Sequence, residues 1–300
     1  MGVLSFKQIF FRSFVGSNGA SQVVFIFLLI PCCFTKDYRA TPFLPNISFL
    51  WAWNAPTEPC PKKFNVSIDL SLFSFIGNPS KDAIGQPVTI FYVDRLGLYP
   101  HIAAPFVRNR VKEAIRVSVV PNEKRPLPIY IYTRPVFTDD SSKYLNQEDL
   151  IHTLGETISL GASGLIIWGS LNLSQSVATC KKLHNYMYTT LNPYIINITL
   201  AAKMCSQVFC QEKGFCTRKN VDSSDYLHLN PMHFTIETDP NGKFKIKGKS
   251  SVEDLKHFAE NFHCSCYSNT DCEKEVNLTH KITIDVCMMK DICIKTVLNS

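Results

Sequence analysis

Residues 151–169 carry the clearest apolar pattern in the chain. Ile151, Leu154, Ile158 and Leu160 recur at helical spacing, which predicts an amphipathic helix. Residues 165–168 follow as an apolar run between glycines with no polar alternation, which is typical of a strand buried on both faces of a parallel sheet. The small residues at 161, 162 and 164 suit a tight turn from the predicted helix to the predicted strand. We predict an αβ unit of a barrel or open α/β sheet, although a buried strand of any α/β domain fits as well.

Three other apolar runs, at residues 45–54, 88–92 and 126–132, also predict buried strands. Residues 93–97 and 133–139 follow two of them, and the carboxyl ends of strands are where α/β folds bind ligands. A helix is predicted after Pro105, and a further helical stretch carries Cys180 to about residue 190. The first helix has an apolar stripe of Val107, Val111, Ala114 and Ile115, and its cations Arg108, Arg110, Lys112 and Arg116 are expected mostly in solvent, with polyanion binding as the alternative.

The character of the sequence changes at Cys205, where closely spaced cysteines replace the long apolar runs. Residues 233–238 and 243–247 alternate with period two around an Asn-Gly turn signal, which predicts a β-hairpin. Lys243, Lys245 and Lys247 share one face of its second strand. Such lysines commonly protect an exposed edge strand, and a polyanion-binding strip is the alternative.

Composition indicates a globular protein that enters the secretory pathway. The chain has 300 residues, 45% of them apolar, and a net charge of +6, which is too weak and dispersed to indicate nucleic-acid binding. Residues 1–35 resemble a signal peptide, with Lys7 and Arg12 before an apolar core at 23–30. No run is long enough for an ordinary membrane span, and the C-terminal residues lack the apolar tail of a lipid-anchor signal.

Ten cysteines remain after residue 35, an even number that favours disulfides in an oxidising compartment, although spacing alone leaves their pairing open. A zinc site at Cys264 and Cys266 is the competing interpretation. Five glycosylation sequons agree with secretion, at Asn46, Asn65, Asn172, Asn197 and Asn277. No other metal site or cofactor is predicted.

Four stretches of this sequence resemble hyaluronidases, most strongly the sperm-surface branch of that family: residues 49–56, 90–97, 161–169 and 192–208. The resemblance covers nearly the whole chain and implies a (β/α) barrel of the TIM type, followed by an epidermal-growth-factor-like (EGF-like) module. The domains would be a signal peptide at 1–35, an incomplete barrel at 36–204 and a cysteine-rich module with a hairpin insert at 205–300. The family reaction is endo-hydrolysis of β-1,4 N-acetylhexosaminidic bonds in hyaluronan by substrate-assisted, retaining catalysis.

The resemblance also assigns roles to single residues. It implies that Tyr92, Asp139 and Trp168 line the sugar site, where aromatic rings stack on pyranoses and a carboxylate accepts from hydroxyls. It further implies five disulfides: Cys60 with Cys180, Cys205 with Cys216, Cys210 with Cys264, Cys266 with Cys272, and Cys287 with Cys293.

The acidic pair that carries the family's chemistry is not found. Members use a Glu proton donor with an Asp two residues earlier, which positions the substrate's acetamido group. The only such spacing here is Asp271 and Glu273, and Cys272 between them is an expected half-cystine, so we interpret it as coincidence. Asp139 and Asp140 are adjacent and would point oppositely on an extended chain, and Glu148 and Asp149 suit a helix N-terminus.

Length supports a missing block. Roughly 150 residues separate the first strand from the cysteine-rich part, whereas a full barrel takes at least about 200. The block would fall between Ile102 and Ala103, leaving the family's first two and last two strands, as in an alternatively spliced form. In a closed barrel the first and last strands are neighbours. We therefore predict the strand order 126–132, 165–168, 45–54, 88–92, with 88–92 and 128–132 as unpaired edges.

Three outcomes are compatible with this sequence: a hyaluronidase-family chain with little or no hydrolysis, a binding or adhesion protein that uses the residual groove, or a chain that fails to fold. The expected partner is hyaluronan or a related glycosaminoglycan, with cell-surface or egg-coat glycoproteins as further candidates. The expected location is the secretory pathway, with a secreted, acrosomal or sperm-surface product.

Overall fold

A computed structural model describes residues 49–75, 89–97, 100–119, 129–239, 241–266, 271–272 and 276–299. The predicted signal peptide and Asn46 lie outside these residues. Tyr38–Ser300 forms one compact unit, separate from Met1–Asp37. The expected boundary at 204/205 falls inside a continuous helix, so the division into barrel and cysteine-rich domains stays a prediction.

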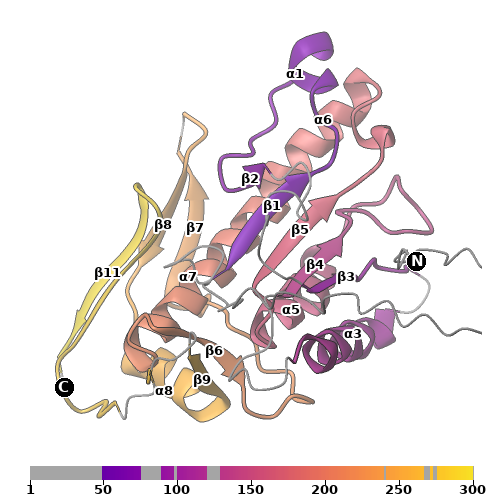
Figure 1. Ribbon diagram of the computed structural model, residues 1–300. Coiled ribbons are helices and arrows are strands. Elements are labelled where there is room, and N and C mark those ends of the chain that lie inside the picture. The colour runs from indigo at the N-terminus through magenta and orange to yellow at the C-terminus, as the bar shows by residue number, and fades with distance from the viewer. Residues whose placement is uncertain are drawn as a thin grey trace, which may run out of the picture. The chain divides into compact units, whose positions relative to one another are not determined.

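A parallel sheet organises the first half of the chain (Figure 1). Its strands are β1 (Leu50–Asn54), β2 (Ser74–Phe75), β3 (Thr89–Tyr92), β4 (Ile129–Thr133) and β5 (Gly164–Trp168). The four longer strands match the predicted ones, and every pairing between them is parallel. This agrees with the expected α/β class.

The predicted order is confirmed for β4-β5-β1 and wrong for β3, because the sheet runs β2-β1-β5-β4-β3. β3 lies beside β4, with Tyr92 opposite Tyr132, and the short β2 occupies the side of β1 where β3 was expected. The strand at 128–132 is therefore interior rather than an edge, while 88–92 is an edge among the described residues. The physical reason is the short connection: one helix joins β3 to β4, and such a βαβ crossover places two parallel strands side by side.

The helices follow the apolar patterns. After η1 (Pro100–Ile102) comes α3 (Ala103–Ser118). A second helical segment is continuous and consists of α4 (Gln147–Leu150), the π-helical turn η2 (Ile151–Gly155) and α5 (Glu156–Ser159). Glu148 and Asp149 lie in the first turn of α4, as expected, and Asn146 caps it. The predicted turn into β5 is confirmed at Gly161, whose φ of +89° is a left-handed conformation that favours glycine.

A second helical run continues beyond the predicted residue 190. Short α1 (Pro59–Phe64) and η3 (Leu171–Leu173) precede α6 (Val177–Tyr186), the π-helical turn η4 (Met187–Leu191) and α7 (Asn192–Phe209). Most α7 residues are buried, because the helix contacts β6 and β10 as well as η4. Among the described residues, no helix is both long enough and apolar enough to cross a membrane.

The two faces of the sheet have different neighbours. Trp51, Trp53, Ile131, Leu165 and Ile167 belong to the main core together with residues of α3, α5, α6 and α7. The alternate positions form a second, small cluster of Leu50, Ala52, Tyr130, Tyr132 and Ile166, against which Trp168 packs. Both faces are buried, which explains why the strands show no polar alternation.

Three antiparallel pairs follow α7: β6 (Gly214–Arg218) with β9 (Phe262–Cys266), β7 (Phe234–Thr238) with β8 (Phe244–Gly248), and β10 (Ile282–Met289) with β11 (Ile292–Leu298). Helix α8 (Val252–Asn261) lies between β8 and β9. The predicted hairpin is confirmed as β7–β8. Lys245 and Lys247 on it are paired with Asp239 at 3.3 Å and Glu237 at 2.6 Å, which weakens the case for a polyanion-binding strip.

The structure contains all five disulfides that the family resemblance implies. Cys264 and Cys266 are both half-cystines, so neither sulfur is a free thiolate for the alternative zinc site. The bond between Cys60 and Cys180 links α1 to α6 across 120 residues. Closing so long a loop contributes about 5 kcal/mol in the chain-entropy description.

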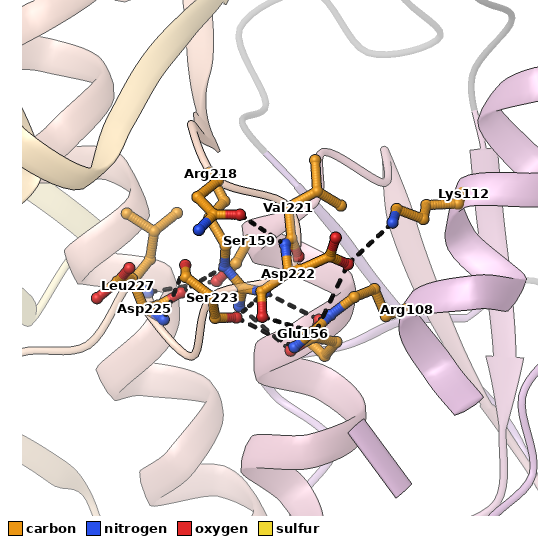
Figure 2. Close-up of polar contacts among 11 residues, drawn as sticks. Arg108, Lys112, Glu156, Ser159, Arg218, Val221, Asp222, Ser223, Asp225 and Leu227 are labelled. Atoms are coloured by element: carbon orange, nitrogen blue, oxygen red, sulfur yellow. Dashed lines mark hydrogen bonds and ion pairs between the residues drawn. The ribbon is translucent and has the colours of Figure 1, made fainter. Parts of the chain in front are cut away.

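A fully buried carboxylate joins the first half of the chain to the second (Figure 2). Glu156 in α5 is 0% exposed and accepts from Arg108 Nε at 2.7 Å and from Arg218 Nη1 at 2.9 Å. The expectation that Arg108 lies in solvent is therefore wrong, although Arg110, Lys112 and Arg116 are exposed as predicted. Backbone carbonyls of the loop at 222–225 accept further hydrogen bonds from both guanidinium groups.

Replacing Glu156 by Gln should lower the free energy of unfolding by about 3–5 kcal/mol, because two buried guanidinium groups would lose their counter-ion. Urea unfolding followed by circular dichroism measures the change. Asp285→Asn is the matched control, since its pair with Lys295 is exposed and should contribute at most about 1 kcal/mol. Equal losses in the two variants would contradict the importance of the cluster.

Acidification should destabilise the fold through His228. Burial lowers the pKa of His228 to about 4, with a smaller contribution from His257, and its Nε2 lies 2.9 Å from the Tyr194 hydroxyl. The folded pKa is below the unfolded value, so the unfolded chain binds the extra proton and stability falls as pH drops from about 6.5 to 4, by up to about 3 kcal/mol.

Unfolding experiments across this pH range test the assignment. In His228→Gln, unfolding should take up about one proton fewer than in the wild type, so the unfolding free energy should depend less steeply on pH. The same substitution at the exposed His101 should leave that dependence unchanged. If His228→Gln retains the wild-type slope between pH 4 and 6.5, another group is responsible.

Candidate functional site

Aromatic side chains meet at the carboxyl ends of the three strands β3, β4 and β5. Tyr92 ends β3 and Trp168 ends β5, with ring centroids 5.7 Å apart in an edge-to-face arrangement. Tyr132 of the intervening β4 lies 5.0 Å from Tyr92. Tyr92 remains 54% exposed. The structure therefore brings together two of the three residues predicted to line a sugar site, on the sheet face of the small cluster.

A charged pair completes this cluster. Asp94, two residues after β3, accepts from Trp168 Nε1 through Oδ1 at 3.1 Å. Its Oδ2 lies 3.3 Å from Arg134 Nε, and the Arg134 guanidinium covers the Trp168 ring at 4.1 Å from the centroid. We call Tyr92, Asp94, Tyr132, Arg134 and Trp168 the aromatic–ionic cluster. Its members come from three neighbouring strand ends, which only the parallel sheet brings together.

Burial governs the acidity of Asp94. Desolvation raises the pKa of its carboxyl above the ordinary value, and the positive charge of Arg134 and the Trp168 N–H oppose that shift. Both carboxylate oxygens already face these partners. Asp94 thus orients the indole and the guanidinium in the observed geometry.

Asp139, the third predicted site residue, has a different contact. Its Oδ1 accepts from the backbone N–H of Gly97 at 2.9 Å, which ties the loop after β4 to the loop after β3. The neighbouring Asp140 accepts from Ser142 within its own loop, so the two carboxylates have separate partners. Asp139 therefore supports the loops around the aromatic–ionic cluster, and the contacts of the described residues do not join it to the rings.

Buried contacts hold the two loops that carry the cluster. Arg95, directly after Asp94, makes a buried ion pair with Asp149 at 3.1 Å. After Trp168 the chain approaches itself closely at Gly169, where a Cβ would lie 2.5 Å from Leu173 Cδ1. These contacts constrain both strand ends.

The side chains of this arrangement are suited to binding a ligand. Aromatic faces and edges pack on sugar rings, and a guanidinium attracts an anionic group, while the mostly buried Asp94 carboxylate holds both in place. Of the residue pair Asp271 and Glu273, Glu273 lies outside the described residues. Cys272 between them is bonded to Cys266, and its carbonyl accepts from Gln211. Among the described residues, no group of three His, Cys, Asp or Glu side chains could hold a metal ion.

Sequence reasoning did not single out Asp94 and Arg134 as site residues. Both lie in the stretches after β3 and β4 that were expected to carry ligand-binding groups, so position along the chain was the available signal. Their partnership depends on β3 lying next to β4, which the predicted strand order excluded. Nothing in the sequence indicated that Glu156 is buried, because a glutamate on an amphipathic helix is ordinarily solvated.

The predicted glycosylation sites differ in accessibility. Asn65, Asn172 and Asn277 are exposed. Asn197 is half-buried in the middle of α7, and its side-chain oxygen accepts from the Leu229 N–H at 3.1 Å.

Comparisons with known proteins agree on one family. Residues 38–105 and 102–276 match the family described as Hyaluronidase. The chain is 38% identical to human hyaluronidase PH-20 over 465 aligned positions, covering 98% of this chain and 91% of the relative. It is 35% identical to mouse hyaluronidase-5 over 471 positions, covering 100% and 90%. Bee venom hyaluronidase is 29% identical over 36% of this chain and 34% of that one, with a TM-score of 0.33.

The alignment lengths exceed the length of this chain. An alignment of 465 positions with a chain of 300 residues leaves at least 165 positions of human PH-20 without a counterpart. The two segments of the family match meet at residues 102–105. Because the match covers far more than half of the sequence and the relatives are aligned over nearly all of it, the chain belongs to the hyaluronidase family.

Proposed function

We propose that this chain is a hyaluronan-binding member of the hyaluronidase family that does not hydrolyse the polymer. The observation that carries the proposal is the aromatic–ionic cluster, which retains groups for sugar recognition in a sequence with no suitable Asp-x-Glu pair. Binding and hydrolysis are separable because a groove can hold a saccharide without a proton donor at the glycosidic oxygen.

Two findings support a missing catalytic segment. The family match is divided at residues 102–105, which is where the sequence predicts the lost block, between Ile102 and Ala103. The long alignments leave room for that block in the relatives. An internal loss of this size would remove the central barrel strands, and with them the acidic pair that the family places at a strand end.

Asp94 is the one member of the cluster that could replace the lost proton donor. Its raised pKa favours this role, but its two oxygens are engaged by Trp168 and Arg134, and protonation would weaken both contacts. No second carboxylate contacts the cluster within the described residues to position an acetamido group. We therefore propose a positioning role for Asp94.

The cysteine-rich part is proposed to be an EGF-like module of a secreted protein. Counting from Cys205, its first and third, second and fourth, and fifth and sixth cysteines pair, which is the order the resemblance implies. Five disulfides form and persist in an oxidising compartment, which supports passage through the secretory pathway.

Purified chain, free of any full-length hyaluronidase, should give no turnover of hyaluronan. Reducing-end release from hyaluronan across acid and neutral pH measures this, with catalytic hyaluronidase as the positive control. The physical reason is the lack of a paired donor and acetamido-positioning carboxylate. If cleavage is seen and disappears in Asp94→Asn, Asp94 serves as the donor and the proposal of a non-hydrolytic chain is wrong.

Binding should depend on the aromatic–ionic cluster. Trp168→Ala and Arg134→Ala should each weaken retention on immobilised hyaluronan about tenfold, since they remove a stacking surface and a cation for the uronate groups. Arg110→Ala is the matched control, because it removes an exposed arginine from α3. Calorimetry at several salt concentrations should show that Arg134→Ala reduces the salt dependence. Equal weakening by Arg110→Ala would indicate attraction by net charge instead of a site.

A further inference from the structure

A cavity lies outside the aromatic–ionic cluster, between the loop after β4 and the start of α6. Its volume is about 150 Å³. Most lining residues are of polar type, among them Ser141, Ser142, Tyr144, Asn172, Gln175 and Lys182, and their carbon atoms supply much of the exposed surface. Hydroxyl, amide and ammonium groups beside carbon surface suit a sugar, which offers both hydroxyl and C–H groups.

One lining residue is itself a predicted site of modification. Asn172 begins the sequon Asn172-Leu173-Ser174, and it is exposed within η3. Ser174 is buried and donates to the carbonyl of Pro56 at 2.7 Å, so the sequon is held rigidly at the rim of the cavity. A sugar attached to Asn172 Nδ2 would start at the wall of this cavity, unlike sugars at Asn65 or Asn277, neither of which lines it.

Two exposed apolar side chains are close in sequence to lining residues. Leu171 in η3 is 65% exposed, and Val177 at the start of α6 is 44% exposed. Lys182 and Gln175 have no hydrogen-bond or ion-pair partner among the described residues, whereas Ser142 donates to Asp140. The cavity therefore combines unpaired polar groups with apolar surface, and the two faces of a pyranose offer hydroxyls and C–H groups to match them.

We propose that the cavity binds the first N-acetylglucosamine of a glycan carried by Asn172 of the same chain. The asparagine amide nitrogen forms a bond to C1 of the sugar, while the C1–O bond to a lipid diphosphate donor breaks. The diphosphate leaves with the electron pair, and the amide nitrogen loses one proton. The docked sugar covers Leu171 and Val177 and stiffens residues 169–176, which directly follow Trp168.

Glycopeptide mass spectrometry of the secreted chain is the first test. Asn172 should be occupied, as should the exposed Asn65 and Asn277. Occupancy at Asn65 and Asn277 with an empty Asn172 would overturn the proposal and leave the secretory route and the proposed hyaluronan binding untouched.

Hydrogen exchange then tests docking. An endoglycosidase that leaves one N-acetylglucosamine should preserve the slow exchange of residues 138–146 and 169–180. The variant Asn172→Gln should exchange there several-fold faster, and Asn277→Gln, the matched control, should not. Lys182→Ala should accelerate exchange only when the sugar is present. Identical exchange of the single-sugar form and Asn172→Gln would show that the glycan extends into solvent and that the proposal is wrong.

Discussion

The ion cluster around Glu156 is the interaction on which the rest of the structure depends. It joins α3, α5, β6 and the loop at 222–225 through one buried carboxylate and two buried guanidinium groups. Removing these charges from water costs several kcal/mol each, and the close contacts and backbone acceptors offset that cost only when all partners are present. The helix that precedes β4 is therefore fixed to the cysteine-rich part as well as to the sheet.

The ion cluster around Glu156 includes a helix that begins where the family match is divided. α3 begins at Ala103, inside residues 102–105, and Arg108 reaches Glu156 from its second turn. The helix buries Val107, Val111 and Ala114 in the main core, so it is positioned by apolar packing and by the ion pair together. α3 lies in the connection from β3 to β4, and these two strands pair in parallel.

The arrangement of strands also determines what the site contains. With β3, β4 and β5 adjacent, their carboxyl ends bring Tyr92, Tyr132 and Trp168 within ring contact. Asp94 and Arg134 then face each other across the same edge. A sheet in the predicted order would separate Tyr92 from Tyr132, so the cluster is a consequence of topology and not of the residues alone.

The sequence by itself determined the local structure and the covalent framework. Apolar periods identified the four long strands, the α3 stripe, the helix-to-strand turn at Gly161 and the β7–β8 hairpin, because each depends on neighbours a few residues apart. The family resemblance supplied the five disulfide pairs and pointed to Tyr92 and Trp168. Only the tertiary structure decided the strand order, the burial of Arg108 and the partnership of Asp94 with Arg134. These depend on segments 40 or more residues apart, and local hydrophobic periods carry no information about which distant strand ends or charges will meet.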